Sequence, residues 1–377
     1  MVSDVFFPRV NGVSTSIESF WSSLALLGIE VTVLAPRYPH PYDDDAGVIR
    51  VDSWRIPFDP EDRLMRFASL RQALEQAAGQ GFDLVHIQTP FAAHFAGQRF
   101  ARRHNLPCVA TYHTHFEEYL FHYVPALPKA ALRAAARQLA RVQCNGVDAV
   151  IVPSRAMEET LSAYGVTAPM HRVPTGIPLE RFVSGDGQAF RARHGIGATQ
   201  PMALFVGRVA HEKNIDFLLD AMPHALRERP DLILVVAGEG PALPALKRRA
   251  EALGIASQVR FVGYLDRVSE LPDSYAAADV FVFASRTETQ GLVLLEAMAS
   301  GVPVLAFAAL GTREIVESGR GAMVAPQNAT DFGRTLAALA NDPARRQQMA
   351  AAARLFATEW STEACAHRLA GVYRECC

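Results

Sequence analysis

The sequence has few cysteines and shows no pattern in them. Its 377 residues include five, which are odd in number, scattered and without a CxxC pair: Cys108, Cys144, Cys365, Cys376 and Cys377. This distribution indicates neither a disulfide framework nor a zinc site. It therefore predicts a reducing, cytoplasmic setting.

Long apolar runs and a charge of one sign are also missing. No stretch is apolar for long enough to span a bilayer, and the N-terminus lacks the basic and then apolar segments of a signal peptide. The formal net charge is −2, which argues against bulk nucleic-acid binding. Half of the residues are hydrophobic and a fifth are charged, as in globular proteins. The length predicts two domains.

Strand-like runs alternate with helical patterns along the chain, an order typical of parallel sheets covered by helices. The predicted strands are 31–35, 84–87, 108–112 and 149–152 in the first half, and 202–206, 232–237, 259–262, 280–283 and 303–306 in the second. Residues 172–178, rich in proline and glycine, and the polar residues 183–200 are predicted to link the two halves. We therefore expect an α/β fold with two doubly wound, Rossmann-like domains.

The chain begins with a loop rather than with a full strand. Residues 5–13 form this loop, and a helix is predicted from Ser16 to Leu27. In a doubly wound domain such a loop follows a central strand, which usually has about five or six residues. We therefore expect the first strand to be incomplete, with Met1 inside it.

The most informative segment is 285–304. It follows an apolar run, passes through a polar turn with Gly291, and continues as a helical pattern that ends at Gly301. The unpaired N–H groups at a helix N-terminus attract anions, so this turn predicts a phosphate site. Glu288 lies in the turn and Glu296 in the helix, where apolar neighbours make an unpartnered carboxylate costly. A ligand with both phosphate and sugar hydroxyls would suit the two carboxylates, although Glu296 alone could be an ordinary helix-face residue.

Three further segments would meet at the same sheet edge if their loops lie at the carboxyl ends of strands. Arg208 and Lys213, five residues apart, suit a diphosphate, although two solvated charges at a helix start are the simpler interpretation of that pair alone. Gly238 opens a Gly-Glu-Gly-Pro turn that either approaches a ligand or is a plain tight turn. Residues 261–265 could form a wall for a nucleobase, although such segments are more often core.

In the first half, polar side chains gather at residues 111–119, after a predicted strand. His113 suits a hydrogen-bonding or proton-transfer role in a cleft. His113 and His115 could instead bind a metal, but no third ligand has a diagnostic spacing, so no metal is predicted. We interpret His86 and His115 as structural, and Gly12 as a point where backbone can approach a ligand.

Taken in order, these segments resemble the retaining glycosyltransferases of family 4, which have the GT-B architecture. The most specific match is the pair of glutamates within TETQGLVLLEAMASGVPV, and the supporting matches are PRVNGV, VPTGI, GRVAHEKN, GEGP and FVGYL. The resemblance covers almost the whole chain and implies two Rossmann-like parallel-sheet domains facing across a cleft. Residues 1–178 would form the acceptor-side domain, residues 179–360 the nucleotide-sugar donor domain, and residues 361–377 a helix that packs back on the first.

The resemblance also implies roles for single residues. His113 and Glu288 would be catalytic, with Glu288 contacting sugar hydroxyls and His113 helping to stabilise the transition state. Arg208 and Lys213 would bind the donor diphosphate, and Glu296 the ribose. Further donor contacts would come from Gly12, Gly238, Gly291, Leu292 and Val293. No metal and no cofactor are implied beyond the nucleotide-sugar co-substrate, which is UDP- or GDP-linked.

The implied reaction moves a hexose, glucose or mannose, from a nucleotide-diphosphate sugar to a hydroxyl of a lipid or glycan, with retention of configuration. The motifs resemble those of members that glycosylate diacylglycerol and those of mannosyltransferases. A nucleotide-sugar epimerase of the same architecture is the alternative; the Arg208 and Lys213 pair disfavours a solute-binding protein. Three positions depart from the family pattern: Thr175 replaces asparagine, Asn214 glycine, and Gln290 an aromatic residue.

A basic stripe follows the aromatic segment 121–128. Lys129, Arg133, Arg137 and Arg141 recur at every fourth residue and so share one helical face. This face suits contact with an anionic membrane, and equally an ordinary solvated helix. Two settings therefore stay open: a cytoplasmic protein, or one that is peripheral at the inner face of a membrane through residues 121–141.

Overall fold

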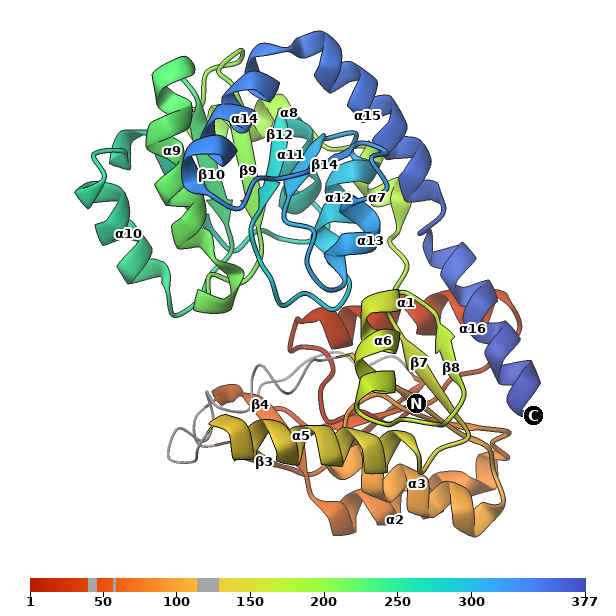
Figure 1. Cartoon of the computed structure of the whole chain (residues 1–377). Helices are drawn as coiled ribbons and strands as arrows, with labels where there is room; N and C mark the ends of the chain where they lie inside the picture. Colours follow the sequence, from red (N-terminus) through yellow and green to blue (C-terminus); the bar gives the residue numbers. More distant parts are fainter. Residues whose placement is uncertain (40–45, 57–58, 114–128) are drawn as a thin grey trace. The chain divides into compact units, whose positions relative to one another are not determined.

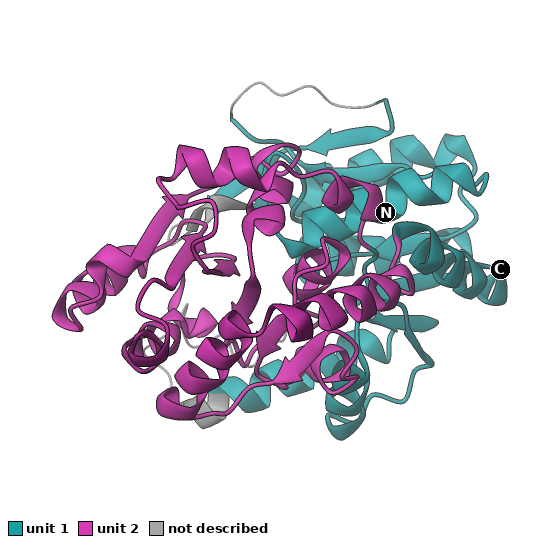
Figure 2. Ribbon diagram, turned by 90° about the horizontal axis from the view of Figure 1, so that it is seen from above, with its two compact units in different colours: residues 1–176, 362–377 teal, residues 177–361 magenta. Residues whose placement is uncertain are grey.

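The structure is a computed structural model that describes residues 1–39, 46–56, 59–113 and 129–377 (Figure 1). The chain forms two compact units (Figure 2). Unit 1 consists of Met1–Gly176 and Thr362–Cys377, and unit 2 of Ile177–Ser361. The chain thus passes between the units after Gly176 and after Ser361, close to the predicted boundaries at residues 178 and 360.

Unit 1 is built on a parallel sheet. Two strands pair at one side, β1 (Val33–Pro36) and β2 (Val48–Val51), and four pair at the other, β5 (Val85–Ile87), β6 (Cys108–Thr111), β7 (Ala149–Val152) and β8 (Met170–Arg172). Val2 joins the two sets through parallel bridges to Leu34 and Ile87. The amino group of Met1 also donates a hydrogen bond of 2.6 Å to the Thr32 carbonyl. Val2 therefore lies between β1 and β5, at a central position of the sheet.

In the part of unit 1 that the structure describes, six helices pack around this sheet: α1 (Gly12–Leu26), α2 (Phe67–Ala77), α3 (Ala92–His104), α5 (Lys129–Cys144), α6 (Arg155–Ala163) and α16 (Thr362–Cys376). α1 begins before the predicted Ser16 because the Asn11 side chain caps it, accepting the Ser14 N–H at 2.9 Å. α16 lies beside α1, and its Leu369 belongs to the same buried cluster as Phe20 of α1.

The prediction missed three parts of unit 1. β2 and β8 are short, and β3 (Ser53–Ile56) and β4 (Asp59–Met65) form an antiparallel hairpin outside the parallel sheet. None of these strands has the unbroken apolar run of a strand buried on both faces. Their place in the fold depends on neighbours that are distant in sequence.

Unit 2 has one six-stranded parallel sheet in the order β11-β10-β9-β12-β13-β14. The strands are β9 (Met202–Val206), β10 (Ile233–Ala237), β11 (Val259–Gly263), β12 (Val280–Phe283), β13 (Val304–Ala306) and β14 (Ala322–Val324). The four strands β9, β10, β12 and β13 are buried along their whole length, which explains their continuous apolar sequences. The edge strand β14 is only partly buried, and the prediction missed it.

The helices of unit 2 alternate with its strands. They are α7 (Leu179–Val183), α8 (Gly187–Arg193), α9 (Ile215–Glu228), α10 (Leu243–Ala252), α11 (Glu270–Ala277), α12 (Leu292–Ala299), α13 (Thr312–Val316), α14 (Ala329–Asn341) and α15 (Pro343–Thr358). The short 3-10 helices among the described residues are η1 (Ala78–Gln80) of unit 1, and η2 (His211–Lys213) and η3 (Ala256–Gln258) of unit 2.

The predicted linker at residues 183–200 is wrong. These residues include α8, which packs against α11 as part of unit 2. Arg191 of α8 is only 7% exposed, and its guanidinium donates to the Ala277 carbonyl and the Asp279 carboxylate. The polar character that suggested a linker thus belongs partly to a buried hydrogen-bonding group.

Candidate functional site

The order of the strands in the parallel sheet of unit 2 reverses between β9 and β12. β9, β10 and β11 follow one another outward on one side, and β12, β13 and β14 on the other. Ligands of open α/β sheets bind where the loops diverge at such a point, at the carboxyl ends of the strands. The loops concerned are 207–214 after β9 and 284–291 after β12, and both contain predicted site residues.

Lys213 and Glu288 form an ion pair between these two loops. Their side chains are 17% and 18% exposed, so the pair is only partly solvated and its attraction is stronger than that of a surface pair. Arg208 lies in the first loop and is exposed. The structure therefore brings the predicted cation Lys213 and the predicted carboxylate Glu288 directly together.

Two further hydrogen bonds hold the same loops. Asn214 Nδ2 donates to the Ala284 carbonyl at 3.1 Å, and Ser285 Oγ to the Glu212 carbonyl at 3.3 Å. Asn214 also has a φ of +55°, a left-handed conformation that glycine adopts most readily and asparagine or aspartate next. The departure from glycine at this position therefore has a physical reason: asparagine accepts the conformation and adds a bond across the site.

The glycine turn after β10 packs against the loop after β9. Gly238 has a φ of +131°, and a Cβ added there would lie 1.9 Å from the Gly207 carbonyl oxygen. A Cβ on Gly240 would lie 2.4 Å from the Val209 carbonyl oxygen. Both glycines are therefore required for backbone packing, and Gly238 is held beside the loop that carries Arg208 and Lys213.

The first turn of α12 follows the Glu288 loop. Gly291 precedes it with a φ of +88°, and Leu292 and Val293, both half-buried, begin the helix. The amides at such a helix start have no partner within the helix, so they remain available to an anion. The predicted phosphate-binding amides and Glu288 thus belong to one continuous turn.

The prediction missed the loop that supports this turn. Gly311 donates its N–H to the Glu288 carbonyl at 2.8 Å, and a Cβ on Gly311 would lie 2.0 Å from the Thr289 carbonyl oxygen. Thr312 is fully buried and donates to the Phe307 carbonyl at 2.8 Å. A Gly-Thr pair after the strand at 304–306 was the available signal, but its partner lies more than twenty residues earlier.

Glu296 is buried, with 5% exposure, on α12. Its Oε2 accepts a hydrogen bond of 2.7 Å from the Tyr275 hydroxyl, and its Oε1 lies 3.9 Å from Nη2 of Arg267. The sequence indicated that this carboxylate needs a partner, and the structure identifies a protein partner that the prediction missed. Tyr275 lies on α11 and Arg267 in the loop before it.

His113 is the candidate catalytic residue of unit 1. It is half-buried just after β6, and its Nε2 lies 2.8 Å from Oε1 of Gln88, which follows β5. Burial lowers the pKa of His113 to about 4, so its ring is neutral at pH 7. His115 lies outside the described residues.

His86 has the structural role that was expected. It is 2% exposed and lies between two hydroxyls, with Nδ1 2.6 Å from the Tyr373 hydroxyl and Nε2 2.6 Å from Oγ1 of Thr111. Burial lowers the pKa of His86 well below its ordinary value. Because Tyr373 belongs to α16, this histidine fastens the last helix to the sheet of unit 1.

Gly12 is the first residue of α1, and no atom lies within 4 Å of a Cβ placed on it. The space beside it is open, so packing does not require glycine there. Thr175, the departure from the family pattern that lies in unit 1, donates a buried hydrogen bond of 2.8 Å to Ser16 Oγ on α1. This bond connects α1 to the chain just before Gly176, where the first segment of unit 1 ends.

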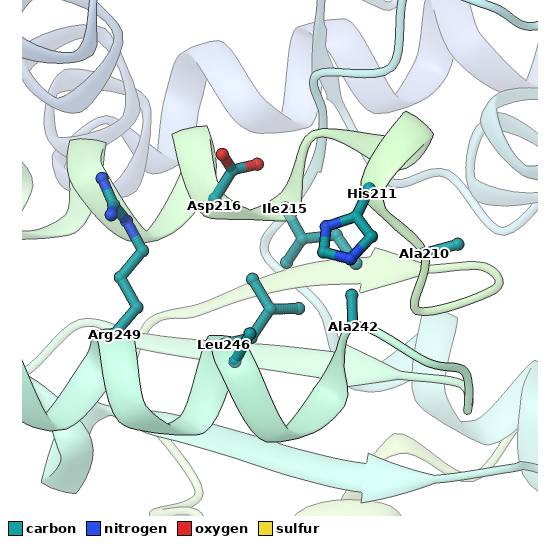
Figure 3. A pocket seen from close by; sticks show the side chains of 8 residues that line it. Ala210, His211, Ile215, Asp216, Ala242, Leu246 and Arg249 are labelled. Atoms are coloured by element: carbon teal, nitrogen blue, oxygen red, sulfur yellow. The ribbon is translucent and has the colours of Figure 1, made fainter. Parts of the chain in front are cut away.

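A pocket of about 200 Å³ lies beside the β9 loop (Figure 3). His211 and Asp216 line it from one side, and Leu246 and Arg249 of α10 from the other. Arg249 Nε is 2.7 Å from the Asp220 carboxylate. Neither Arg208 nor Lys213 lines the pocket, so it is separate from the predicted donor residues.

Within the described parts of the chain, no group of three or more histidine, cysteine, aspartate or glutamate side chains could hold a metal ion. None of the helices among these residues is both long enough and apolar enough to cross a membrane.

Two family models cover most of the chain. "Glycosyltransferase Family 4" matches residues 10–181, and "Glycosyl transferases group 1" matches residues 186–356. An alpha-monoglucosyldiacylglycerol synthase of Streptococcus pneumoniae (strain ATCC BAA-255 / R6) is 36% identical over 318 residues, which are 81% of this chain and 70% of that protein. The chain belongs to the family 4, group 1 glycosyltransferases.

Further relatives of this glycosyltransferase agree with the assignment. A GDP-mannose-dependent alpha-mannosyltransferase of Mycobacterium tuberculosis (strain CDC 1551 / Oshkosh) is 31% identical over 361 residues, 94% of this chain and 90% of the relative. Sucrose-phosphate synthase from Thermosynechococcus elongatus has the same fold, with a TM-score of 0.80, 24% identity and coverage of 97% and 94%. The expected GT-B fold with Rossmann-like parallel-sheet domains is confirmed, and the epimerase alternative finds no support in these relatives.

Proposed function

We propose that this glycosyltransferase moves a hexose, glucose or mannose, from a UDP- or GDP-linked donor to a hydroxyl of a lipid or glycan, with retention of configuration. The main support is the Lys213–Glu288 ion pair, which lies where the strand order of unit 2 reverses. Glu288 also belongs to the turn directly before α12. The names of the relatives support the substrate classes, since one is a monoglucosyldiacylglycerol synthase and another uses GDP-mannose.

The diphosphate of the donor would bind to positive charge and amides of unit 2. Arg208 and Lys213 supply two cations, and the first turn of α12 supplies N–H groups from Gly291, Leu292 and Val293. Negative charge grows on the leaving diphosphate as the sugar bond breaks, and fixed donors there lower the barrier. These groups provide the charge that the leaving group needs, so the proposal requires no metal ion.

The two glutamates would divide the remaining contacts. Glu288, paired with Lys213, would accept hydrogen bonds from sugar hydroxyls near the reacting carbon, and Glu296 would bind the ribose. Gly238 and, in unit 1, Gly12 would offer backbone close to the donor. His113, neutral at pH 7, would act as the second catalytic residue by hydrogen bonding to the transferred sugar.

Donor binding and transfer can be tested together. A thermal-shift titration with UDP-glucose and GDP-mannose should raise the melting midpoint for the true donor, because a ligand that binds only the folded state stabilises it. Glu288→Ala should then abolish transfer while the variant stays folded. The exposed Glu251 on α10 provides the matched control, Glu251→Ala, which should keep full activity. Near-normal turnover of Glu288→Ala would contradict the proposal.

We also propose a peripheral membrane contact through residues 121–141. Residues 121–128 lie outside the described part, but α5 exposes Arg133, Arg137 and Arg141 on one stripe, with Leu139 46% and Val142 57% exposed beside it. Arginines next to exposed apolar side chains favour binding to an anionic leaflet. Arg137 also stacks on Tyr164 at 5.4 Å, which favours the alternative of an ordinary helix face.

Vesicle sedimentation separates these two interpretations. The protein should bind vesicles of phosphatidylglycerol more strongly than vesicles of phosphatidylcholine, and the double variant Arg133→Glu with Arg141→Glu should bind phosphatidylglycerol less. Equal binding to both lipids, or no effect of the charge reversal, would leave α5 as an ordinary solvated helix.

A further inference from the structure

Burial of the Tyr275 hydroxyl costs free energy unless the hydroxyl is hydrogen-bonded. Tyr275 is fully buried on α11, and its ring packs at 5.7 Å against Phe182 and at 5.9 Å against Phe281. A phenylalanine would fill this apolar site without a polar atom, whereas a buried hydroxyl needs a hydrogen-bond partner. The partner determines what the hydroxyl contributes.

The Tyr275 hydroxyl has one proton and two neighbours that could accept it. Glu296 Oε2 lies at 2.7 Å and the Val293 carbonyl oxygen at 3.4 Å. A carboxylate is the stronger acceptor and is much closer, so the proton goes to Glu296. Tyr275 therefore fixes one oxygen of this carboxylate, and with it the orientation of the carboxylate plane.

The other oxygen, Oε1 of Glu296, has a different environment. Its nearest charged neighbour among the described residues is Arg267, at 3.9 Å, which is too long for a direct hydrogen bond. Arg267 is 27% exposed and lies in the loop that follows β11 and Tyr264. Oε1 thus keeps its capacity to accept a hydrogen bond from a hydroxyl.

We propose that Tyr275 is a positioning residue for the nucleotide: by holding Oε2 of Glu296, it directs Oε1 toward a ribose hydroxyl of the donor. This rests on the proposed function, in which Glu296 binds the ribose. Tyr275 does not touch the nucleotide; it acts through Glu296. Its rigid ring, packed on α7 and β12, gives the carboxylate a fixed direction before the nucleotide binds.

The test measures how well the protein distinguishes a ribose hydroxyl. Calorimetric binding of UDP and GDP is compared with binding of their 2′-deoxy and 3′-deoxy forms, for the wild-type chain and for Tyr275→Phe. The wild-type chain should bind one deoxy form about tenfold more weakly than the parent nucleotide, since a hydrogen bond to a charged acceptor is lost. In Tyr275→Phe this ratio should fall to about threefold or less, with affinity for the deoxy form nearly unchanged.

Tyr373→Phe is the matched control. It also removes one buried tyrosine hydroxyl with a short hydrogen bond, here to His86, but in unit 1. It should cost a similar amount of stability and leave the ratio between parent and deoxy nucleotide at its wild-type value. A ratio that falls equally in both variants would mean a general loss of stability and would overturn the proposal.

A second variant keeps the test decisive. If Tyr275 acts only through Glu296, Glu296→Gln and the double variant with Tyr275→Phe should show the same low ratio, because the two side chains form one unit. Additive losses, an unchanged ratio in a folded Tyr275→Phe, or failure of Tyr275→Phe to fold would overturn the positioning role while wild-type binding supports the proposed function. Failure of the wild-type chain to bind either nucleotide would overturn both.

Discussion

Unit 1 and unit 2 carry their candidate residues in different electrostatic settings. In unit 2, the candidate residues meet as charges: Lys213 pairs with Glu288, and Arg267 lies near Glu296. In unit 1, the candidate residue His113 is neutral at pH 7, and its partner is an amide, Gln88. The charged candidate residues thus lie in unit 2, where a diphosphate is proposed to bind.

The buried titratable groups show the same contrast. Burial shifts the pKa of several groups in unit 1 strongly, lowering that of His94 to about 4 and raising that of Asp4 to about 6. In unit 2 the large buried shift belongs to Tyr275, which stays protonated and donates to Glu296. The stability of unit 1 should therefore depend more strongly on pH than that of unit 2. Substitution of a charged residue should affect nucleotide binding more strongly in unit 2 than in unit 1.

The largest effect is expected from removing the shared cation of unit 2. Lys213→Ala deletes a proposed diphosphate contact and leaves Glu288 without its ion-pair partner. We expect kcat/KM to fall by about 100- to 1,000-fold, in the range found when one preorganised donor to a developing charge is removed. Steady-state kinetics with the donor identified by thermal shift measures the change.

Lys247→Ala provides the control for this variant, because Lys247 is an exposed lysine on α10 of the same unit. It should leave kcat/KM unchanged. A Lys213→Ala enzyme with less than about a tenfold loss would contradict the electrostatic role of unit 2.

A smaller effect on catalysis is expected in unit 1. His113→Ala should lower kcat by roughly 10- to 100-fold, because one hydrogen bond to the sugar is lost in the transition state. Affinity for the free nucleotide should stay within about twofold of wild type, since the proposed nucleotide contacts of unit 2 are intact. Kinetics and calorimetry on the same preparation measure both quantities.

The pH profile sharpens this expectation. Because the pKa of His113 is lowered to about 4, its ring should not titrate between about pH 5 and 8, and kcat should show no inflection from it there. A nucleotide affinity that falls in His113→Ala as much as in Lys213→Ala would remove the distinction between the units.

The third expectation concerns stability and tests the pH response of unit 1. His94 is 4% exposed on α3, and burial lowers its pKa to about 4. Below about pH 6.5 the unfolded chain binds a proton at His94, whereas the folded chain does not until the pH nears 4. The contribution of the neutral histidine to the free energy of unfolding is therefore complete above about pH 6.5 and is lost as the pH falls. Between pH 7 and pH 5, this residue should reduce the free energy of unfolding by about 2 kcal/mol. His94→Gln should remove that part, as measured by urea unfolding at both pH values.

Asp4 acts in the opposite direction over part of the same range. Its raised pKa means that the folded chain keeps a proton that the unfolded chain has lost, so stability falls as pH rises from about 4 to 6. The exposed His367 on α16 gives the control variant His367→Gln, which should keep the wild-type pH dependence. An unchanged pH dependence in His94→Gln would show that this histidine is not the source.

The smallest effect is expected at Asn214 in unit 2. Asn214→Gly keeps the left-handed conformation but loses the hydrogen bond to the Ala284 carbonyl, so it should cost about 1 kcal/mol. Asn214→Ala loses the same bond and adds conformational strain of roughly 1–2 kcal/mol. Melting midpoints should therefore fall in the order wild type, Gly, Ala. Equal midpoints for the two variants would mean that the backbone conformation does not matter at this loop.

The strands of unit 2 could be predicted because β9, β10, β12 and β13 are buried on both faces and carry unbroken apolar runs. Their loops could be placed at one edge of the sheet from topology alone. The ion pair itself could not be predicted, because Lys213 and Glu288 are 75 residues apart and the sequence indicates neither their distance nor their mutual burial.

Other parts were not predictable, for the same physical reason. Tyr275 has the sequence pattern of an ordinary helix residue, and its hydrogen bond to Glu296 of α12 is known only from the structure. The same holds for Gln88 and its contact with His113. Arg191 lies in a segment whose polar residues predict a linker, yet it is buried against Ala277. Each of these contacts is made by tertiary packing between segments, which local sequence patterns do not encode.

The attachment of α16 has a consequence for the order of synthesis. Tyr373 and Leu369 complete the buried interior of unit 1, although the chain has by then passed through the whole of unit 2. Unit 2 is one continuous stretch and has all of its residues before α16 is made. Domains generally fold as units during synthesis. The apolar surface of unit 1 that α16 covers therefore stays exposed to solvent until α16 has been synthesised. A fragment that ends at Gly176 should accordingly aggregate, and addition of a peptide with the sequence of residues 362–377 should restore its solubility.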